Sequence, residues 1–143
     1  MGLDMFLYKR RKNSKGAKQK EREEICYWRK ANAILNWFDH NLDSVRNQGG
    51  EDNSSLSREG VRNVTYYTVK KEEYQKLLDD CKKLLENKTY IPADMLPTSG
   101  FFFGSGSVDE WFWKSIEHTV TELEKQQGNI DWNRDIVEFY IWY

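Results

Sequence analysis

The stretch Asp-Ile-Val-Glu-Phe-Tyr-Ile-Trp-Tyr at residues 135–143 decides the fold class of this chain. It is rich in the β-branched and aromatic residues that favour strands. Apolar side chains fall on both of its alternating faces, which is typical of a strand at a central position in a sheet with cover on each side. We therefore expect these residues to form an inner strand.

Two further stretches predict strands that pair with it. Residues 2–8 alternate so that apolar side chains occupy both faces, and residues 62–69 are rich in β-formers. Their apolar members are Leu3, Met5, Leu7, Phe6 and Tyr8 in the first stretch, and Val64, Tyr66, Tyr67 and Val69 in the second. Three phenylalanines at 101–103 predict a short buried strand or turn.

Residues 21–46, 70–87 and 108–127 carry the 3.6-residue apolar spacing of amphipathic helices. Ser107 and Glu110 have capping-box spacing, so Ser107 is the expected N-cap of the third helix. Packing three such helices against one small sheet is the simplest way to bury their stripes. We expect an α+β fold, with a mostly antiparallel or mixed sheet of three to four strands and three amphipathic helices.

Length and charge indicate one domain over residues 1–143 with two long loops. The net charge of −1 hides seven Lys and Arg residues between positions 9 and 20, where no acid occurs. We expect a basic loop at 9–20 and a flexible loop at 47–60. The rest of the chain is acidic, which argues against a dedicated DNA-binding domain.

The sequence favours a cytoplasmic protein. No secretory leader opens it, and no apolar run approaches the ~18–20 residues of a membrane span. Cys26 and Cys81 stand outside any CxxC or Cys/His cluster, so we expect two reduced, partly buried thiols.

Residues for catalysis are few. His40 and His118 belong to no HExxH pattern, and no GxSxG, Walker A or GxGxxG motif occurs. We expect no cofactor and no metal. The scarcity of catalytic residues favours binding over catalysis, and the remaining alternative is an enzyme whose active-site residues are scattered along the chain.

A candidate binding face lies on the first expected helix. At 100° per residue, Trp28 and Arg29 fall beside Asn32 and Asn36. An indole, a guanidinium and two amides suit a planar polar ligand or a peptide. The alternative is that this face packs under the sheet or a loop, with Arg29 paired to a carboxylate.

Two features of the third helix add to the candidates. Backbone amides of the Gly-Ser-Gly-Ser run at 104–107, including Gly104 and Ser105, can cradle an anion, although acids in the first turn argue for a simple capped helix entry. Trp111 and Trp113 lie on different sides of this helix, so we expect one to be exposed as an interface anchor, unless the helix is covered on two sides.

The basic segment offers Lys9, Arg10, Arg11 and Lys12 as contacts for nucleic acid or an acidic partner. Tyr8 is its only neighbouring aromatic residue, so the segment offers few rings on which nucleobases could stack. The sequence therefore favours a solvated loop here, and nucleic acid is an unfavoured partner.

Four motifs carry a resemblance. Met-Gly-Leu-Asp-Met at 1–5, Tyr-Trp-Arg-Lys-Ala-Asn at 27–32, Trp-Phe at 37–38 and Gly-Phe-Phe-Phe-Gly-Ser at 100–105 resemble a family of small uncharacterised proteins of bacteriophages and prophages. The similarity spans most of the chain outside the two loops, and it implies no activity. Relatives tend to have a His where this chain has Leu35, and a Tyr/Ser/Trp-rich end where it has Phe-Tyr-Ile-Trp-Tyr.

The leading hypothesis is a phage-type accessory protein that acts by binding a host protein, such as a component of an antiviral defence system, in the cytoplasm of the bacterial host. The alternative is a small-ligand protein for a nucleotide signal. It would use the face of Trp28, Arg29 and Asn32 together with the 100–107 loop.

Overall fold

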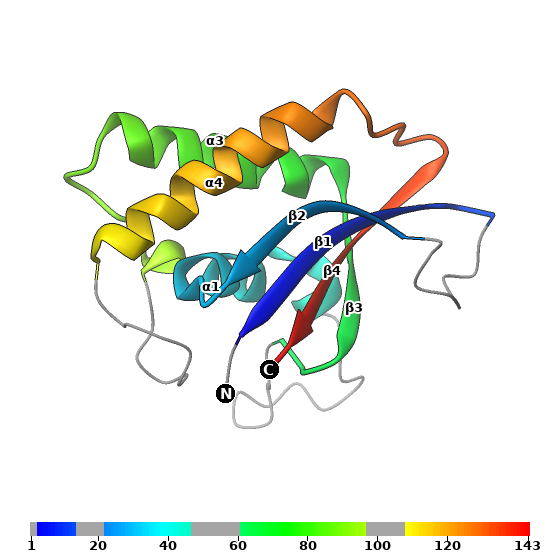
Figure 1. The fold of residues 1–143 in the computed structure, drawn as a ribbon, viewed down its shortest axis with the longest axis horizontal. Coiled ribbons are helices and arrows are strands. Elements are labelled where there is room, and N and C mark those ends of the chain that lie inside the picture. The colour runs from blue at the N-terminus through cyan, green and yellow to red at the C-terminus, as the bar shows by residue number, and fades with distance from the viewer. Residues whose placement is uncertain (1–2, 14–21, 47–60, 97–107) are drawn as a thin grey trace.

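The computed structural model describes residues 3–13, 22–46, 61–96 and 108–143. Figure 1 shows the elements in chain order. They are β1 (Asp4–Arg11), β2 (Glu23–Arg29), α1 (Asn32–Asn41), α2 (Asp43–Arg46), β3 (Thr65–Val69), α3 (Lys71–Glu86), the 3-10 turn η2 (Ala93–Met95), α4 (Glu110–Gln127) and β4 (Asp135–Trp142).

The four strands form one sheet in the order β2-β1-β4-β3, and every neighbouring pair is antiparallel. β4 lies between β1 and β3, so the expectation of an inner C-terminal strand is confirmed. The α+β class is confirmed as well. β2 and β3 are the two edge strands.

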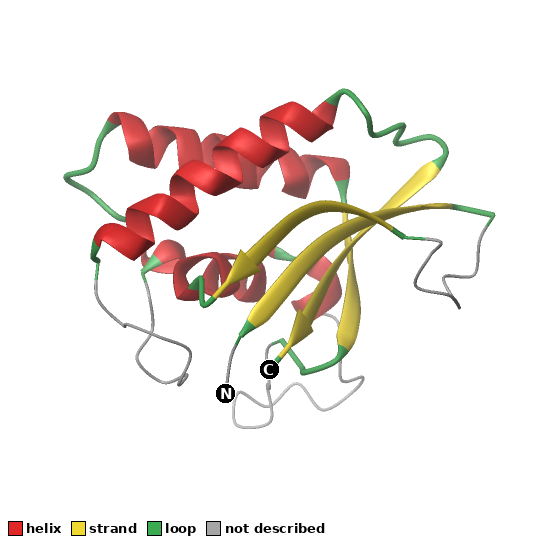
Figure 2. Ribbon diagram, viewed as in Figure 1, coloured by secondary structure: helices red, strands yellow, loops and turns green. Residues whose placement is uncertain are grey.

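The helices lie together on one face of the sheet (Figure 2). Phe38 of α1 stacks on Phe139 of β4 with ring centroids 4.0 Å apart, and Trp28 of β2 meets Phe38 edge-on at 5.6 Å. Tyr74 of α3 donates its hydroxyl to the Leu123 carbonyl of α4 at 2.6 Å. Aromatic packing on this inner face therefore joins the helices to the sheet and to each other.

The helix expected over 21–46 is wrong in its first third. Residues 23–29 form β2, and helix begins only at Asn32. From Cys26 onward the burial follows the two-residue period of a strand: Cys26 and Trp28 are buried, whereas Tyr27 and Arg29 are exposed. Ile25 is buried beside Cys26 where the register with β1 shifts. Pairing with β1 overrides the helical spacing, and Lys30 then turns the chain at φ 52° with its N–H bonded to the Leu3 carbonyl at 2.8 Å.

The basic loop expected at 9–20 is wrong at its start, because β1 continues to Arg11. Lys9 pairs with Glu23, and Arg10 and Arg11 pair with carboxylates of β4. Cross-strand ion pairs thus accommodate these cations within the sheet. Residues 14–20, the loop at 47–60 and the run at 101–103 lie outside the described residues.

The start of the third helix also differs from expectation. Its N-cap is Asp109, whose carboxylate accepts the Phe112 N–H at 3.0 Å, and α4 begins at Glu110. Asp is as good an N-cap as Ser, and here it is the residue that satisfies the helix start. The expected cap, Ser107, is outside the described residues.

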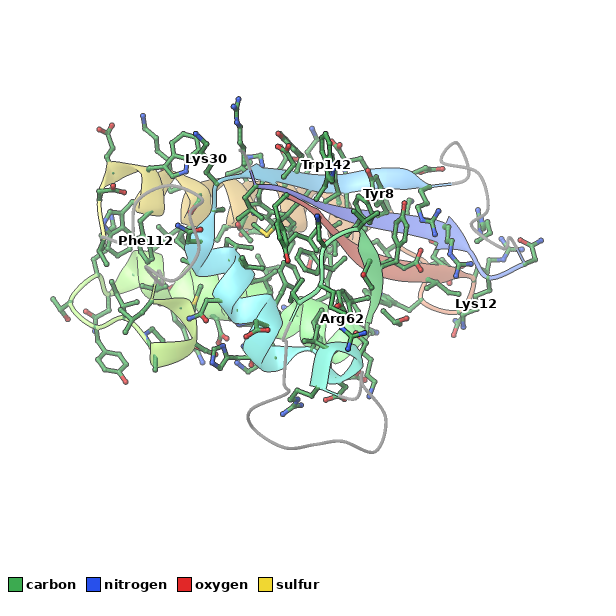
Figure 3. The ribbon with its side chains drawn as sticks, turned by 90° about the horizontal axis from the view of Figure 1, so that it is seen from below. Tyr8, Lys12, Lys30, Arg62, Phe112 and Trp142 are labelled. Carbon is green, nitrogen blue, oxygen red and sulfur yellow. The ribbon has the colours of Figure 1, made fainter. Side chains whose placement is uncertain are left out.

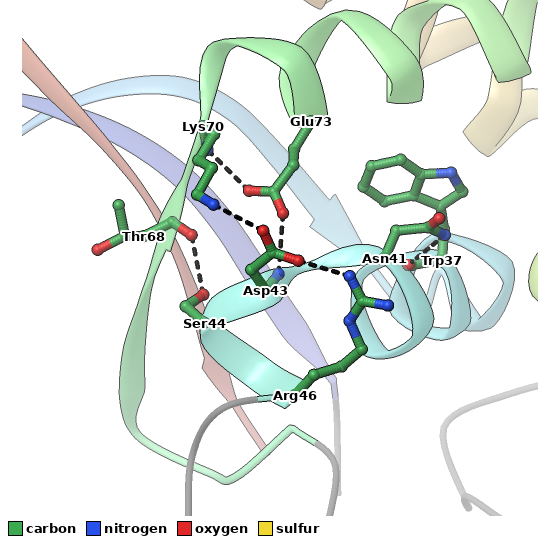
Figure 4. Close-up of polar contacts among 8 residues, drawn as sticks. All are labelled: Trp37, Asn41, Asp43, Ser44, Arg46, Thr68, Lys70 and Glu73. Carbon is green, nitrogen blue, oxygen red and sulfur yellow. Dashed lines mark hydrogen bonds and ion pairs between the residues drawn. The ribbon is translucent and has the colours of Figure 1, made fainter.

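One carboxylate joins the starts of two helices (Figure 4). Glu73 of α3 accepts the Lys70 N–H and the Asp43 N–H, each at 2.8 Å. Ser44 of α2 donates its hydroxyl to the Thr68 carbonyl of β3 at 2.8 Å. α2 is therefore fixed both to α3 and to the edge of the sheet.

Candidate functional site

A row of four aromatic side chains crosses the sheet on the face opposite the helices. The register pairs Tyr27 of β2 with Phe6 of β1, Phe6 with Tyr140 of β4, and Tyr140 with Tyr66 of β3. Their ring centroids follow at 5.0, 6.2 and 4.4 Å. Each strand therefore contributes one ring to a continuous aromatic row.

Two more rings extend the row along the strands. Tyr8 stacks on Phe6 at 5.4 Å, and Trp142 lies two residues beyond Tyr140 on β4, so it projects to the same face. Trp142 is 57% exposed and Tyr27 is 37% exposed. Figure 3 labels Tyr8 and Trp142 at the sheet. We call Phe6, Tyr8, Tyr27, Tyr66, Tyr140 and Trp142 the aromatic sheet face.

The charges on this face are paired with one another. Glu138 accepts from Arg10 Nε at 2.9 Å and from Arg22 Nε at 3.2 Å, and its side chain is almost fully buried. Arg22 also lies over the Tyr66 ring, 3.7 Å from its centroid. One carboxylate here bonds to two guanidiniums, so this group of three charged side chains keeps one net positive charge.

The Tyr27 hydroxyl is held in its neutral form. It donates a hydrogen bond to the Asp4 carboxylate, and this bond raises the pKa of Tyr27, with burial adding to the effect. The phenol therefore acts as a fixed donor at one end of the aromatic row, and Asp4 is occupied as its acceptor.

On each edge strand of the sheet, a side chain from a neighbouring helix bonds to one backbone carbonyl. On β2, the Tyr27 carbonyl bonds to His118 Nε2 at 2.7 Å, and just beyond it the Lys30 carbonyl accepts from the Trp111 indole at 3.3 Å. On β3, Ser44 covers the Thr68 carbonyl. Blocked edge carbonyls disfavour the addition of a partner strand at these positions.

A groove of about 300 Å³ lies between β2 and α4. Its described lining is Tyr27, Trp28, Arg29, Ala31, Trp111, Lys114, Ser115 and His118, and we call it the β2–α4 groove. Trp111 is 50% exposed there. The lining combines aromatic walls with cationic groups, and none of its residues is acidic.

The face expected at Trp28, Arg29, Asn32 and Asn36 does not exist as one surface. Trp28 points into the core and donates its indole N–H to Thr119 Oγ1 at 2.8 Å. Asn32 is buried, and Asn36 donates its amide to the carbonyls at 93 and 96, at 3.2 and 2.9 Å, which fixes η2. The strand that replaces the first helical turns places Trp28 and Arg29 on opposite faces of the sheet, and the Asn36 amide is used to hold η2.

Trp111 is the exposed member of the tryptophan pair. Trp113 is half-buried, packs edge-on against Phe112 at 4.9 Å and has the Lys88 ammonium 5.0 Å from its ring centroid. The groove therefore brings together Trp28, Arg29 and Trp111 among the expected site residues. Gly104 and Ser105 lie outside the described residues.

The remaining basic candidates lie at the other end of the sheet. Lys12 and Arg11 line an open cleft of about 410 Å³ with Asn13 and Arg134. Lys9 donates to the Asn129 carbonyl at 2.6 Å in addition to its ion pair with Glu23. Most of these cations already have protein partners, which reduces the charge they offer to a phosphate backbone.

Sequence analysis missed the aromatic sheet face. The signal was present in the two-sided apolar pattern of residues 2–8 and 135–143, which was interpreted as cover on both sides. Only the register, which places Tyr27 and Tyr66 beside these strands, turns scattered rings into a row.

The described residues hold no cluster of three or more His, Cys, Asp or Glu side chains that could bind a metal ion. Cys26 and Cys81 are buried free thiols, and burial raises the pKa of each. Within the same ranges of the chain, no helix has the length and apolar character needed to cross a membrane. Comparisons with protein-family models, curated proteins and solved structures find no match to this chain.

Proposed function

We propose that this protein acts by binding a protein partner on the aromatic sheet face. The observation that carries the proposal is the in-register row of four rings with exposed Trp142 beside it, on the sheet face away from the helices. Tyr, Trp and Arg are enriched where protein interfaces concentrate their binding energy. Their rings supply a large contact area at a small cost in conformational entropy.

The charge pattern supports a protein partner over single-stranded nucleic acid. Stacking platforms for single strands combine their aromatic residues with a positively charged track for the phosphates. Here Arg10 and Arg22 are both engaged by Glu138, in the middle of the face. These cations are therefore held by a carboxylate of the protein and do not form a track of free positive charge for phosphates.

The resemblance to phage and prophage proteins supports a host origin for the partner. The proposal is therefore a phage-type accessory protein that binds a protein of the bacterial host, such as a component of an antiviral defence system, in the host cytoplasm. The aromatic sheet face is the part of the chain that would make the contact.

The test uses the full chain as bait in lysate of the bacterial host, followed by purification of the captured protein and calorimetric titration of the pair. Trp142→Ala removes the most exposed ring of the face, and Tyr90→Ala removes an exposed ring in the loop between α3 and η2, outside the face. Hot-spot residues contribute about 2 kcal/mol or more, so Trp142→Ala should raise Kd roughly thirty-fold. Tyr90→Ala should leave Kd unchanged.

Two results would refute the proposal. One is the absence of any stoichiometric partner for the wild-type chain. The other is a purified partner whose Kd responds equally to Trp142→Ala and Tyr90→Ala, because this would place the contact elsewhere. Circular dichroism of each variant verifies that the fold is retained.

A further inference from the structure

The β2–α4 groove contains a ring that is held in place before any ligand arrives. The Trp111 indole N–H bonds to the Lys30 carbonyl, and the Lys30 N–H bonds to the Leu3 carbonyl of the adjacent strand segment. Half of the Trp111 surface still faces solvent. A pre-oriented, exposed indole is a good surface for stacking a planar ring, because little side-chain entropy remains to be lost.

Two cations border the same groove. Arg29 is exposed at the end of β2, and Lys114 is exposed one turn along α4 from Trp111. Lys114 forms an ion pair of 3.2 Å with Glu110, but both side chains are well exposed, and such pairs contribute little. Asp4, which is opposite Arg29 in the sheet, already accepts from Tyr27.

The backbone of β2 adds a donor on this side. The Tyr27 carbonyl bonds to His118, so the backbone polar groups of Tyr27 point away from β1. In an antiparallel pair this direction repeats every second residue, which turns the Arg29 N–H the same way, toward α4. An anion in the groove would therefore meet a guanidinium, an ammonium and a backbone N–H.

We propose that the β2–α4 groove binds a nucleoside monophosphate, with the base stacked on Trp111 and the phosphate between Arg29 and Lys114. A phosphate carries more charge than a carboxylate, and two cations match it, since Arg in particular forms paired hydrogen bonds to phosphate oxygens. The volume of about 300 Å³ is at the small end of ligand cavities, which favours one nucleotide over a dinucleotide. This site shares Tyr27 with the aromatic sheet face, but the inference does not depend on a partner binding that face.

The test is calorimetric titration of the full chain with the adenosine, guanosine, cytidine and uridine monophosphates. Adenosine and inorganic phosphate are the control ligands. At least one monophosphate should bind, and neither control ligand should bind within ten-fold of its affinity, because the site needs both the ring and the charge.

Variants separate the contributions of ring and charge. Arg29→Ala and Lys114→Ala should each raise Kd about ten-fold, whereas Lys125→Ala, which removes an exposed lysine near the other end of α4, should have no effect. Trp111→Ala should raise Kd at least about five-fold, and Trp111→Phe, which keeps a stacking ring but loses the bond to Lys30 that orients it, should raise Kd by less than Trp111→Ala. Trp142→Ala should leave nucleotide binding intact, which distinguishes this site from the aromatic sheet face.

Three outcomes overturn the inference. The first is that no monophosphate binds. The second is that adenosine binds as tightly as its monophosphate, or that phosphate alone binds as tightly. The third is that Lys125→Ala weakens binding as much as Lys114→Ala, since the effect would then come from the loss of any positive charge on α4 and not from a contact in the groove.

Discussion

Glu73 provides the sharpest stability prediction, because a single carboxylate satisfies backbone donors from two helix starts. It accepts the Lys70 N–H at the start of α3 and the Asp43 N–H at the start of α2, each at 2.8 Å. The carboxylate is buried although Glu is usually exposed. Replacing it with alanine leaves two partly buried N–H groups without this acceptor.

The magnitude follows from the two bonds. A hydrogen bond to a charged group contributes about 1.5–3 kcal/mol net when it is well protected, and loss of a helix cap costs about 0.5–2 kcal/mol. Because both bonds are only partly buried, Glu73→Ala should lower the free energy of unfolding by about 2–4 kcal/mol. Glu73→Gln keeps one neutral acceptor and should lose about half as much. Such losses are large against the 5–15 kcal/mol of a typical domain.

The assay is urea denaturation followed by tryptophan fluorescence and far-UV circular dichroism. The matched control is Glu72→Ala, which removes the same residue type from the same helical turn at an exposed position. It loses only an interaction with the helix dipole, worth about 0.3–1 kcal/mol. Equal losses for Glu72→Ala and Glu73→Ala would refute the reasoning, because the effect would then come from charge at the helix start and not from the two hydrogen bonds.

Two further predictions concern named polar contacts. Trp28→Phe removes the buried indole donor to Thr119 Oγ1 and should lower the free energy of unfolding by about 1–3 kcal/mol in the same urea assay; an unchanged midpoint would contradict it. Lys70 and Arg46 lower the pKa of Asp43 through hydrogen bonds, so its contribution to stability is present above the unfolded value near 3.8 and is lost as pH falls through the lower folded value. Wild type should therefore lose more stability than Asp43→Asn on acidification below about pH 4 at low salt, and parallel curves would contradict this.

The fold was predictable where one period dominates the sequence. β1, β3, β4, α3 and α4 each carry a run long enough for a two- or 3.6-residue pattern to stand out, and they lie close to their expected positions. Residues 23–29 are the exception, because a helix was expected there and a strand forms. Tyr27 fits a helical stripe that continues into α1. The neighbouring pair Cys26 and Trp28 fits a strand instead. Pairing with β1 decides between the two, and a non-local contact of this kind leaves no trace in a local pattern.

The sequence indicated some of the residues of the candidate sites, but it did not indicate where in the fold these residues meet. Trp28, Arg29 and Trp111 do meet at one groove, but they meet because β2 lies against α4, and no helical spacing within 21–46 describes that contact. The two-sided apolar character of residues 135–143 correctly indicated an inner strand. Apolar side chains on both faces do not require that both faces be covered by other elements. Tyr rings on one face can pack against each other and still leave their hydroxyl edges exposed to water, as among the described elements here.

Covered edge carbonyls, and a sheet face that no helix of the described residues covers, together restrict how the proposed partner could bind this sheet. A backbone-to-backbone extension of β2 would have to displace His118 and Trp111 from its carbonyl side, and an extension of β3 would have to displace Ser44. Each displacement costs a formed hydrogen bond before any new one is gained. If the proposed partner binds this sheet, the covered carbonyls favour contact through side chains of the face, where the cross-strand register fixes the ring geometry. Single-ring substitutions such as Trp142→Ala should then affect its affinity far more than changes along the strand edges.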